Sequence, residues 1–336
     1  MGSANYHARI RFQDGSASWL LRVPRVASFA VGFPVSLADY LVHSEYATLK
    51  FLETTNVPAP RAFGYGVCSN GTDHGVGVSF LLVEELPGRP WTGATPDEKA
   101  KIWCDLAEIM VELERHPFPK AGSLCFQSSK IDVCAVASDR FVVLTPDGPF
   151  ASSTAYHTAF AEHECLPSLP VSQGQRGAAG RTRRTNTFSG RISLKHVDDK
   201  GDHLLVDDNL DITGIIDWQM ARVVPRREAF GPSLVTANMS ALCRGKVSLS
   251  VDDVALADAL RQKGIFQLPS SMVDEKVRRF FWGLALEPKC SYALPLANAV
   301  LQVFGVDQDW TQWRETALKK YETDERLEGL LQRFEY

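Results

Sequence analysis

Two short apolar runs lie close together in the sequence, and a loop with an aspartate borders each of them. The run 204–206 follows a polar loop that contains Asp198, and the run 212–216 ends at Asp217. Apolar segments joined by a polar turn predict a β-hairpin, which would bring both flanking loops to the same end. No other part of the sequence constrains the fold as strongly, because this pattern places two strands and the point where two carboxylates meet.

A pair of carboxylates in such a position suits phosphoryl transfer. That reaction needs the charge on the nucleotide phosphates neutralised and a carboxylate that orients the attacking hydroxyl. Asp198 and Asp217 can divide these two tasks. Acidic turns are often only solvated loops, so the pattern alone leaves both interpretations open. A calcium loop of the EF-hand type is excluded, because Ile212 occupies the position that requires glycine.

Length and composition limit the remaining possibilities. The chain has 336 residues, of which 45% are hydrophobic, and this is enough for one large domain or two lobes. Its net charge of -4 favours neither a nucleic acid nor a membrane as partner. The 7 cysteines are scattered without a CxxC pair, which indicates neither a disulfide framework nor a zinc site. Without a membrane-spanning run or a signal peptide in this sequence, we expect a cytoplasmic location.

The first part of the chain predicts a hairpin and a helix. The segments 7–12 and 19–23 flank the turn 14–15 and read as two strands. Apolar positions at helical spacing predict a helix over 39–53, and this helix carries Glu45. This region therefore forms a small β-rich lobe with one helix.

A hinge and a helical region follow. The apolar run 78–83 predicts a strand that stops at 84–88, where proline and glycine end extended structure. Thr95 and Glu98 then form a capping-box pattern that opens a helix, and another helix is predicted over 250–263. Further helical stripes, expected in the core, contain Val273, Val277, Phe281, Leu284, Trp310, Trp313, Ala317, Tyr321, Leu327 and Leu331.

This order of elements predicts an α+β fold with two unequal lobes. We expect a nucleotide-binding lobe over residues 1–86 and a larger helical lobe over 87–336, with the acidic hairpin at 194–218. We also expect the first strand of the small lobe to be missing, because few residues precede the first recognisable strand. The sheet would then have an exposed edge.

An ordered set of motifs resembles the aminoglycoside phosphotransferase family, whose relatives include choline, homoserine and sugar kinases. The strongest are His196-x-Asp198, His203-Leu-Leu-Val and Ile-Ile-Asp217-Trp218. Weaker matches are spread over most of the chain at Trp19–Pro24, Val57–Pro60 and Leu82–Gly88, and those at Phe118–Leu124, Val223–Pro225 and Ala229–Pro232 resemble the fungal branch. The resemblance implies a bilobal protein kinase-like fold and ATP-dependent transfer of phosphate to a hydroxyl of a small molecule, with ATP and Mg²⁺ as cofactors.

The resemblance also implies roles for individual residues. Asp198 would be the catalytic base and His196 would orient its loop. Asp217 would bind the metal, and His203 stands where the family has its second metal ligand. The nucleotide would be bound by four positions: the phosphate-contacting Arg22, its partner Glu45, and the backbone of Glu84 and Leu86 at the hinge.

Two residues depart from the family pattern. His203 replaces an asparagine, and an imidazole is a less suitable magnesium ligand than an amide oxygen. Arg22 replaces a lysine, which keeps the charge but presents a planar fork. These departures, with the shortened first lobe, support an alternative in which the chain is a kinase-like pseudoenzyme that acts as a binding or scaffold protein.

Other functional questions stay open at the level of sequence. A protein serine/threonine kinase is less favoured, because no Asp-Phe-Gly triplet stands at Asp217. Three acidic residues, Glu228, Glu275 and Glu287, are candidates for a pocket that binds a cationic acceptor. The acceptor, the choice between ATP and GTP, and the oligomeric state are not determined by these motifs.

Overall fold

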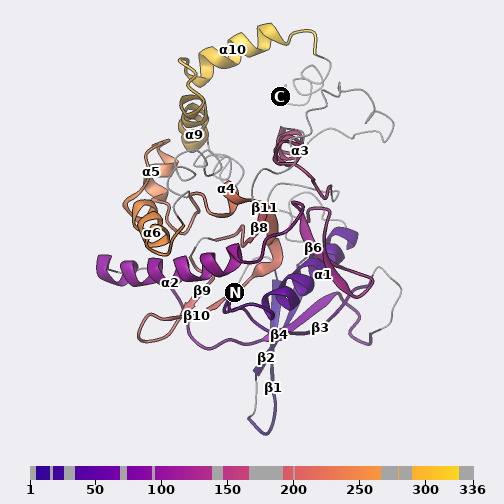
Figure 1. Cartoon of the computed structure of the whole chain (residues 1–336). Coiled ribbons are helices and arrows are strands. Elements are labelled where there is room, and N and C mark those ends of the chain that lie inside the picture. Colours follow the sequence, from indigo (N-terminus) through magenta and orange to yellow (C-terminus); the bar gives the residue numbers. More distant parts are fainter. Residues whose placement is uncertain are drawn as a thin grey trace.

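The computed structural model describes residues 5–15, 18–25, 35–68, 74–92, 95–137, 147–165, 192–199, 201–265, 279 and 290–324. A small antiparallel sheet with one helix lies at one end of the molecule, and the larger, mainly helical part lies at the other (Figure 1). The α+β class with two unequal parts, predicted from the sequence, is confirmed.

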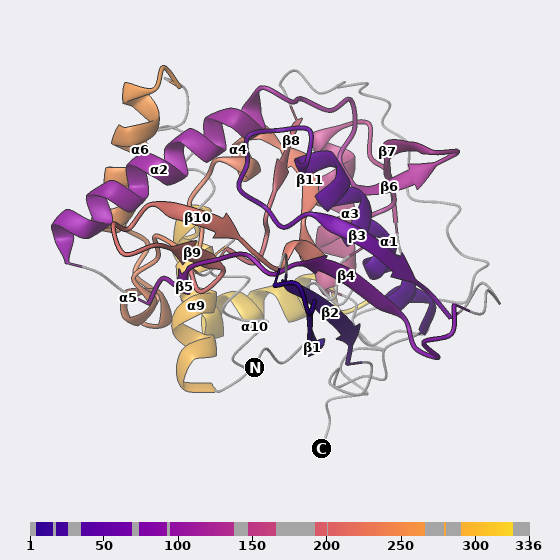
Figure 2. The ribbon, with the colours of Figure 1, turned by 90° about the horizontal axis from the view of Figure 1, so that it is seen from below.

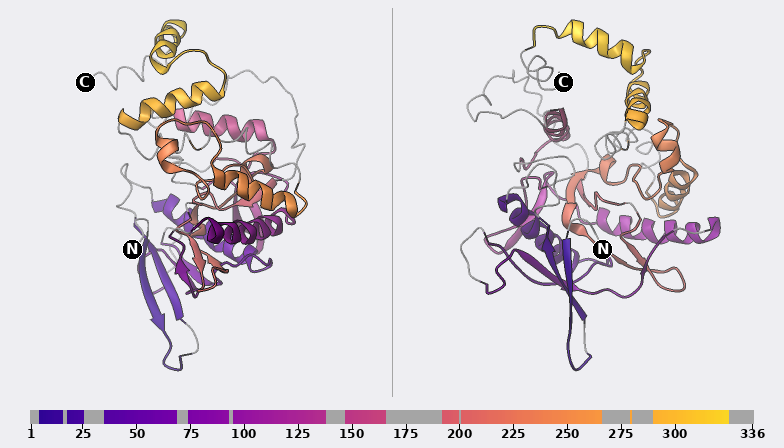
Figure 3. Two further views of the ribbon diagram at one scale, coloured as in Figure 1. Left: turned by 90° about the vertical axis from the view of Figure 1, so that its left-hand side faces the viewer. Right: turned by 180° about the vertical axis from the view of Figure 1, so that it is seen from behind.

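The small lobe is built on a four-stranded antiparallel sheet of order β1-β2-β4-β3. Its strands are β1 (Asn5–Arg11), β2 (Ser18–Pro24), β4 (Phe80–Glu84) and β3 (Ala62–Gly66). The predicted first hairpin is confirmed, with Asn5 opposite Pro24. Beyond Asn5 the side chains of β1 are exposed, and β1 forms one edge of this sheet. The β1–β2 hairpin projects from the body of the molecule (Figure 3).

Helix α1 (Val35–Leu52) packs against this lobe and against the site region. Its buried face includes Leu41, Leu49 and, unusually, Glu45. The helix contacts β3, β4 and the short 3-10 helix η2 (Trp218–Met220). α1 therefore links the small sheet to the residues that follow Asp217.

The hinge joins the second lobe through a three-stranded sheet. The order is β10-β9-β5, with β5 (Arg89–Pro90), β9 (Leu204–Val206) and β10 (Ile212–Ile215). This confirms the predicted hairpin and adds the hinge strand to it. Gly88, which directly precedes β5, has a φ of +112, and a Cβ at this position would lie 2.5 Å from Thr213 Oγ1. Only glycine fits this close approach.

Two more strand pairs complete the centre of the molecule. β8 (Ile192–Lys195) pairs with β11 (Arg222–Pro225), and β6 (Ser123–Gln127) pairs with β7 (Lys130–Cys134). β6 also packs against α1. β8 leads directly into the loop that carries Asp198.

Helices surround these strands. α2 (Pro96–Glu114) begins with the predicted capping box and packs against α6 (Val251–Gln262), as Figure 2 shows. The other helices in the described residues are α3 (Ser153–Cys165), α4 (Arg226–Ala229), α5 (Met239–Cys243), α9 (Cys290–Val303) and α10 (Trp310–Lys320). Of the described helices, none has both the length and the apolar character that crossing a membrane requires.

The core prediction is wrong for the last helix. α10 has no buried residue, and Trp310 and Trp313 stack on each other at 5.3 Å instead of entering the core. The helix is amphipathic in sequence, and among the described elements its main packing partner is α9. The other predicted stripe residues Val273, Val277, Phe281, Leu284, Leu327 and Leu331 lie outside the described residues.

Candidate active site

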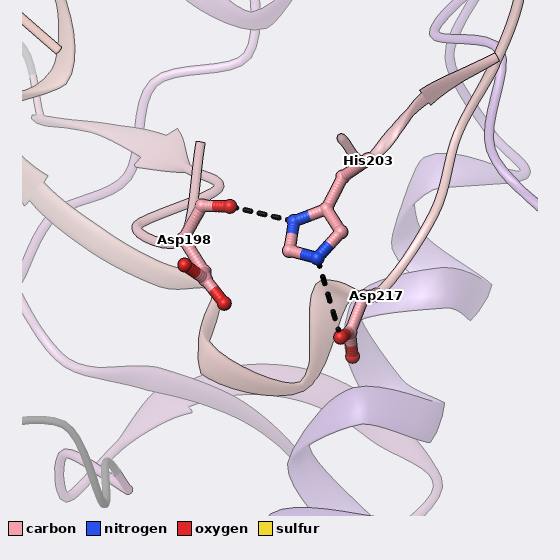
Figure 4. A group of neighbouring side chains, drawn as sticks. All are labelled: Asp198, His203 and Asp217. Carbon is pink, nitrogen blue, oxygen red and sulfur yellow. Dashed lines mark hydrogen bonds and ion pairs between the residues drawn. The ribbon is translucent and has the colours of Figure 1, made fainter. Parts of the chain in front are cut away.

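The two acidic loops meet at one end of the β9–β10 hairpin. Ile215 lies opposite Leu204, and the N–H of Ile216 donates to the carbonyl of His203 at 3.0 Å. The hairpin register thus continues past the strands and places Asp217 beside His203. Potential ligand atoms of Asp198, His203 and Asp217 all lie within 4.8 Å of one another (Figure 4).

His196 holds the loop of Asp198 against the loop of Asp217. Its Nε2 donates to the carbonyl of Ile216 at 2.8 Å, and its ring packs edge-on against Trp218. Burial lowers the pKa of His196, so burial favours the neutral ring. The imidazole therefore has contacts expected of an orienting residue.

Asp217 has an unusual backbone conformation. Its φ of 66 and ψ of 55 lie in the left-handed region, which aspartate tolerates better than most residues. Trp218, which follows, is 1% exposed and donates from Nε1 to the carbonyl of Ile215 at 2.7 Å. The anchored tryptophan helps to fix the strained turn, and with it the direction of the Asp217 carboxylate.

Arg22 connects three separate elements. This side chain of β2 is buried, bonds Glu45 of α1 through Nη1, and donates from Nη2 to Asp217 Oδ1 at 2.6 Å. The predicted pairing of Arg22 with Glu45 is thus present. The contact with Asp217 ties the small sheet to the acidic hairpin.

Burial and these contacts shift the pKa values of Arg22, Glu45 and Asp217. Burial opposes the charge of Arg22, but the carboxylates of Glu45 and Asp217 outweigh it and raise the pKa of Arg22. Burial also opposes ionisation of Asp217, yet Arg22 and His203 bring its pKa to about 2. For Glu45, burial dominates over the attraction of Arg22 and raises the pKa to about 7. Asp217 is therefore fully ionised at neutral pH.

The donor set fits a divalent cation. Two carboxylates and one imidazole are common metal ligands, and they converge here from two loops. Asp198 is 5% exposed, whereas the side chain of Asp217 is 31% exposed. The cluster is thus enclosed on one side and accessible on the other.

The predicted hinge residues lie next to this hairpin. The N–H of Glu84 donates to the carbonyl of Arg61 at 2.9 Å, so that group is already used within the sheet. The side chain of Leu86 packs on Gly214, where a Cβ would lie 2.5 Å from Leu86 Cδ1. Thr213 Oγ1 donates to the carbonyl of Pro87 at 2.9 Å. These contacts bind the hinge to β10.

One acidic candidate is in the wrong place for an acceptor pocket. Glu228 is 1% exposed and accepts a hydrogen bond from Tyr156 at 3.0 Å, with Arg222 at 3.6 Å. The Glu228 carboxylate therefore interacts with groups inside the protein. Glu275 and Glu287 lie outside the described residues.

Two contacts of the site were not predicted from the sequence. Asp199 Oδ1 accepts the N–H of Leu234 at 3.2 Å, which ties the loop of Asp198 to the segment after α4. Asn5 Nδ2 donates to Gln219 Oε1 at 3.0 Å, which ties β1 to the turn after Asp217. Both pairs are far apart in sequence, and no local pattern signals them.

A family comparison agrees with this geometry. The model of the Phosphotransferase enzyme family (APH) matches residues 3–240, which include all the site residues named above. The chain belongs to this family. The predicted membership is confirmed, and the two-lobed α+β architecture is the protein kinase-like fold that it implies.

Individual relatives are more distant. Subtelomeric hrmA-associated cluster proteins from two strains of Aspergillus fumigatus are 33% identical over 92 residues, which is 26% of this chain and 18% of each relative. The match therefore spans less than a fifth of the length of these curated relatives.

Solved structures with a similar arrangement include two phosphotransferases. A thermostable mutant of aminoglycoside phosphotransferase APH(4)-Ia, in a ternary complex with AMP-PNP and hygromycin B, is 12% identical with a TM-score of 0.46, over 92% of this chain and 97% of that chain. Macrolide 2'-phosphotransferase type I is 13% identical with a TM-score of 0.41, over 90% and 87%. At these values neither structure identifies the substrate of this chain.

Proposed function

We propose that this family member is an ATP-dependent phosphotransferase that transfers the γ-phosphate to a hydroxyl of a small molecule. The observation that carries the proposal is the meeting of the Asp198 and Asp217 carboxylates at one end of the hairpin, beside the buried guanidinium of Arg22. Membership of the family supports phosphoryl transfer. The nucleotide, the metal and the hydroxyl acceptor are parts of the proposal.

Asp198 would orient the acceptor hydroxyl and accept its proton. A positioned carboxylate performs this task in kinase-like sites, where catalysis depends mainly on orientation and electrostatics. His196 would keep the loop in register through its bond to Ile216. The buried position of Asp198 limits its motion.

Asp217 and His203 would hold the divalent cation, Mg²⁺ in the simplest case. When bound, such a cation neutralises charge on the nucleotide phosphates. Arg22 would contact the phosphates and already holds one oxygen of Asp217, with Glu45 on its other side. Because the pKa of Asp217 is about 2, this ligand is ionised throughout the physiological range.

The hinge would bind the adenine edge. Because the N–H of Glu84 is bonded to Arg61, the proposal assigns the carbonyl of Glu84 and the backbone of Leu86 to this contact. The two lobes would then be residues 1–86 and 87–336, in a cytoplasmic enzyme.

A direct test replaces Asp198 by Asn in the full chain. Transfer of labelled γ-phosphate from ATP to a metabolite mixture should fall about 10²- to 10⁴-fold, because the base is lost, while ATP binding persists. Asp258→Asn on α6 is the matched control, since Asp258 is half exposed and pairs only with Arg261 among the contacts identified for it. Equal turnover in Asp198→Asn and the parent would contradict the proposal.

A pseudoenzyme is the second candidate function, and two observations favour it. Arg22 occupies one oxygen of Asp217, and an imidazole stands at the second metal position. Thermal unfolding separates the candidates, because a ligand stabilises the state that binds it. A rise in Tm with ATP that requires a divalent cation supports the enzyme. A rise that is indifferent to the cation supports the pseudoenzyme.

A further inference from the structure

His203 is held in one protonation tautomer by a backbone group. Its Nδ1 lies 2.6 Å from the carbonyl oxygen of Asp198. A carbonyl oxygen can only accept a hydrogen bond, so Nδ1 carries the hydrogen. In the neutral ring the lone pair is then on Nε2. A backbone carbonyl that orients a histidine in this way is typical of the support around a metal-ligating imidazole.

Nε2 of His203 faces carboxylate oxygens. Asp217 Oδ2 lies at 3.6 Å and Asp202 Oδ1 at 3.8 Å, and both distances are too long for hydrogen bonds. A lone pair directed towards two carboxylates is repulsive, and either a proton or a metal ion on Nε2 removes this repulsion. Figure 4 shows the ring between Asp198 and Asp217, with its two nitrogens directed to opposite sides.

The spacing suits a shared cation. Two ligand atoms at about 2.1 Å from one ion lie about 3.4 Å apart at a tetrahedral angle. The 3.6 Å between His203 Nε2 and Asp217 Oδ2 is close to this value. The His203 side chain is 13% exposed, and Arg22 fixes Asp217 Oδ1, so Oδ2 remains as the oxygen on the side of the imidazole. Little movement is needed to place both ligands on one ion.

His196 does not compete for this role. Its ring lies 5.3 Å from that of His203, its Nε2 is bonded to the carbonyl of Ile216, and neither of its ring nitrogens belongs to the group of ligand atoms that gather within 4.8 Å. The imidazole ligand of the site is thus His203 alone among the described histidines that touch this cluster.

A nitrogen ligand changes which metal is preferred. Magnesium takes oxygen ligands in near-octahedral geometry and keeps several waters. Imidazole suits first-row transition metals, whose affinity for such sites rises from manganese towards copper. We propose that the site of Asp198, His203 and Asp217 binds a divalent transition-metal ion through His203 Nε2, in preference to magnesium. This inference extends the proposed function. A role of the bound metal in phosphate transfer rests on that function, whereas metal binding itself does not.

The test uses Mn²⁺ as the probe and the full chain with any affinity tag removed. Pulsed EPR detects nitrogen bound to Mn²⁺, and calorimetry gives the affinities for Mn²⁺ and Mg²⁺, each with and without a non-hydrolysable ATP analogue. We expect nitrogen coupling in the parent chain. Labelling its histidines with ¹⁵N should shift the coupling frequencies, which confirms an imidazole ligand without any substitution.

His203→Asn provides the matched change, because it restores the amide ligand of the family pattern. Nitrogen coupling should disappear, and the ratio of Mn²⁺ to Mg²⁺ affinity should fall on the order of tenfold or more. His157→Asn, at an exposed position of α3, makes the same chemical change away from the site and should alter neither quantity. Circular dichroism verifies that both variants are folded.

The outcomes separate this inference from the proposed function. Mn²⁺ bound without nitrogen coupling, or no metal bound by the folded parent chain with or without the analogue, overturns the metal assignment. Nitrogen coupling in the protein alone, with no binding of the ATP analogue, supports the metal assignment and contradicts the kinase proposal. Nucleotide binding with an Mn²⁺ signal that shows only oxygen ligands contradicts the metal assignment and is compatible with the kinase proposal.

Discussion

Arg22 and Arg279, two of the buried arginines, lie in different lobes and are surrounded in different ways. Arg279 in the helical lobe bonds both oxygens of Asp253, the hydroxyl of Thr236 and the carbonyl of Ser233. Arg22 in the sheet lobe bonds Glu45 and one oxygen of Asp217. Asp253 is fully buried, whereas the side chain of Asp217 is 31% exposed.

From this difference we expect the Arg279–Asp253 pair to stabilise the fold and the Arg22–Asp217 pair to position a carboxylate of the candidate site. The Arg279 cluster is enclosed, and both of its charged members, Arg279 and Asp253, are satisfied by protein groups, so its loss should act on folding. Arg22 shares its charge with a carboxylate that stays accessible, so its loss should act on the chemistry of the site. Each prediction below tests one side of this comparison.

The largest effect is expected for Arg279→Met. This change leaves Asp253 buried without its cation, which typically costs about 3–5 kcal/mol. Urea unfolding measures the loss. Arg261→Met on α6 is the control, because Arg261 is 47% exposed and should change the free energy of unfolding by less than about 0.5 kcal/mol. Equal losses in the two variants would show that the Arg279 cluster is not a stabilising unit.

Arg22→Gln should instead reduce turnover on the order of 100-fold, because Asp217 loses the contact that fixes it. Its loss of stability should be smaller than that of Arg279→Met. The pKa of Glu45 is already about 7, so Glu45 can become neutral by taking up a proton. Steady-state kinetics and urea unfolding on the same preparation compare the two effects.

The same variant should depend on pH in a definite direction. Without Arg22 the pKa of Glu45 rises further in the folded state, above its ordinary value in the unfolded chain. Stability from this group is then present at low pH and is lost as the pH rises through the folded pKa. The destabilisation by Arg22→Gln should therefore be larger at pH 8 than at about pH 5.5. A destabilisation that does not change with pH would show that Glu45 is ionised regardless of Arg22.

The smallest effect concerns a carboxylate near the end of α2, whose charge is held first by a backbone hydrogen bond and not by a buried arginine. Backbone donation from Asn56 lowers the pKa of Glu112 to about 2, and Arg115 and His116 act in the same direction. Its contribution to stability is present above the ordinary pKa of glutamate and is lost as the pH falls through about 2. In Glu112→Gln the free energy of unfolding should thus fall less between about pH 4.5 and 2 than in the parent chain.

Urea unfolding at several acid pH values checks this expectation. Glu108→Gln on the same helix is the control, because Glu108 is 64% exposed and pairs only with Lys263 among the contacts identified for it. A parent chain that loses no more stability in acid than Glu112→Gln would contradict the assignment.

Local sequence signals predicted the parts of the fold that short segments determine. The capping box at Thr95 fixed the start of α2, and the apolar runs around 204–216 fixed the β9–β10 hairpin. The convergence of Asp198 and Asp217 followed from that hairpin, because strand pairing determines where its two ends lie. The pairing of Arg22 with Glu45 came from the family resemblance, since no spacing in the sequence implies it.

Contacts between distant segments could not be predicted. The bonds of Arg279 to Asp253 and of Asp199 to Leu234 depend on how loops and helices pack. The exposure of α10 is a related case. Its sequence is amphipathic, but amphipathicity shows only that one face can be covered and not that a neighbouring element covers it.

The left-handed backbone at Asp217 determines how the site can be silenced. Asparagine and glycine accept this conformation readily, whereas β-branched residues do not. Both are also reached from an aspartate codon by a single nucleotide change. A mutation at this one position can therefore remove the proposed metal-binding carboxylate without straining the backbone, so Asp217→Asn is the variant of choice for separating substrate binding from the proposed phosphoryl transfer, and a single base change in the gene is enough to reach it.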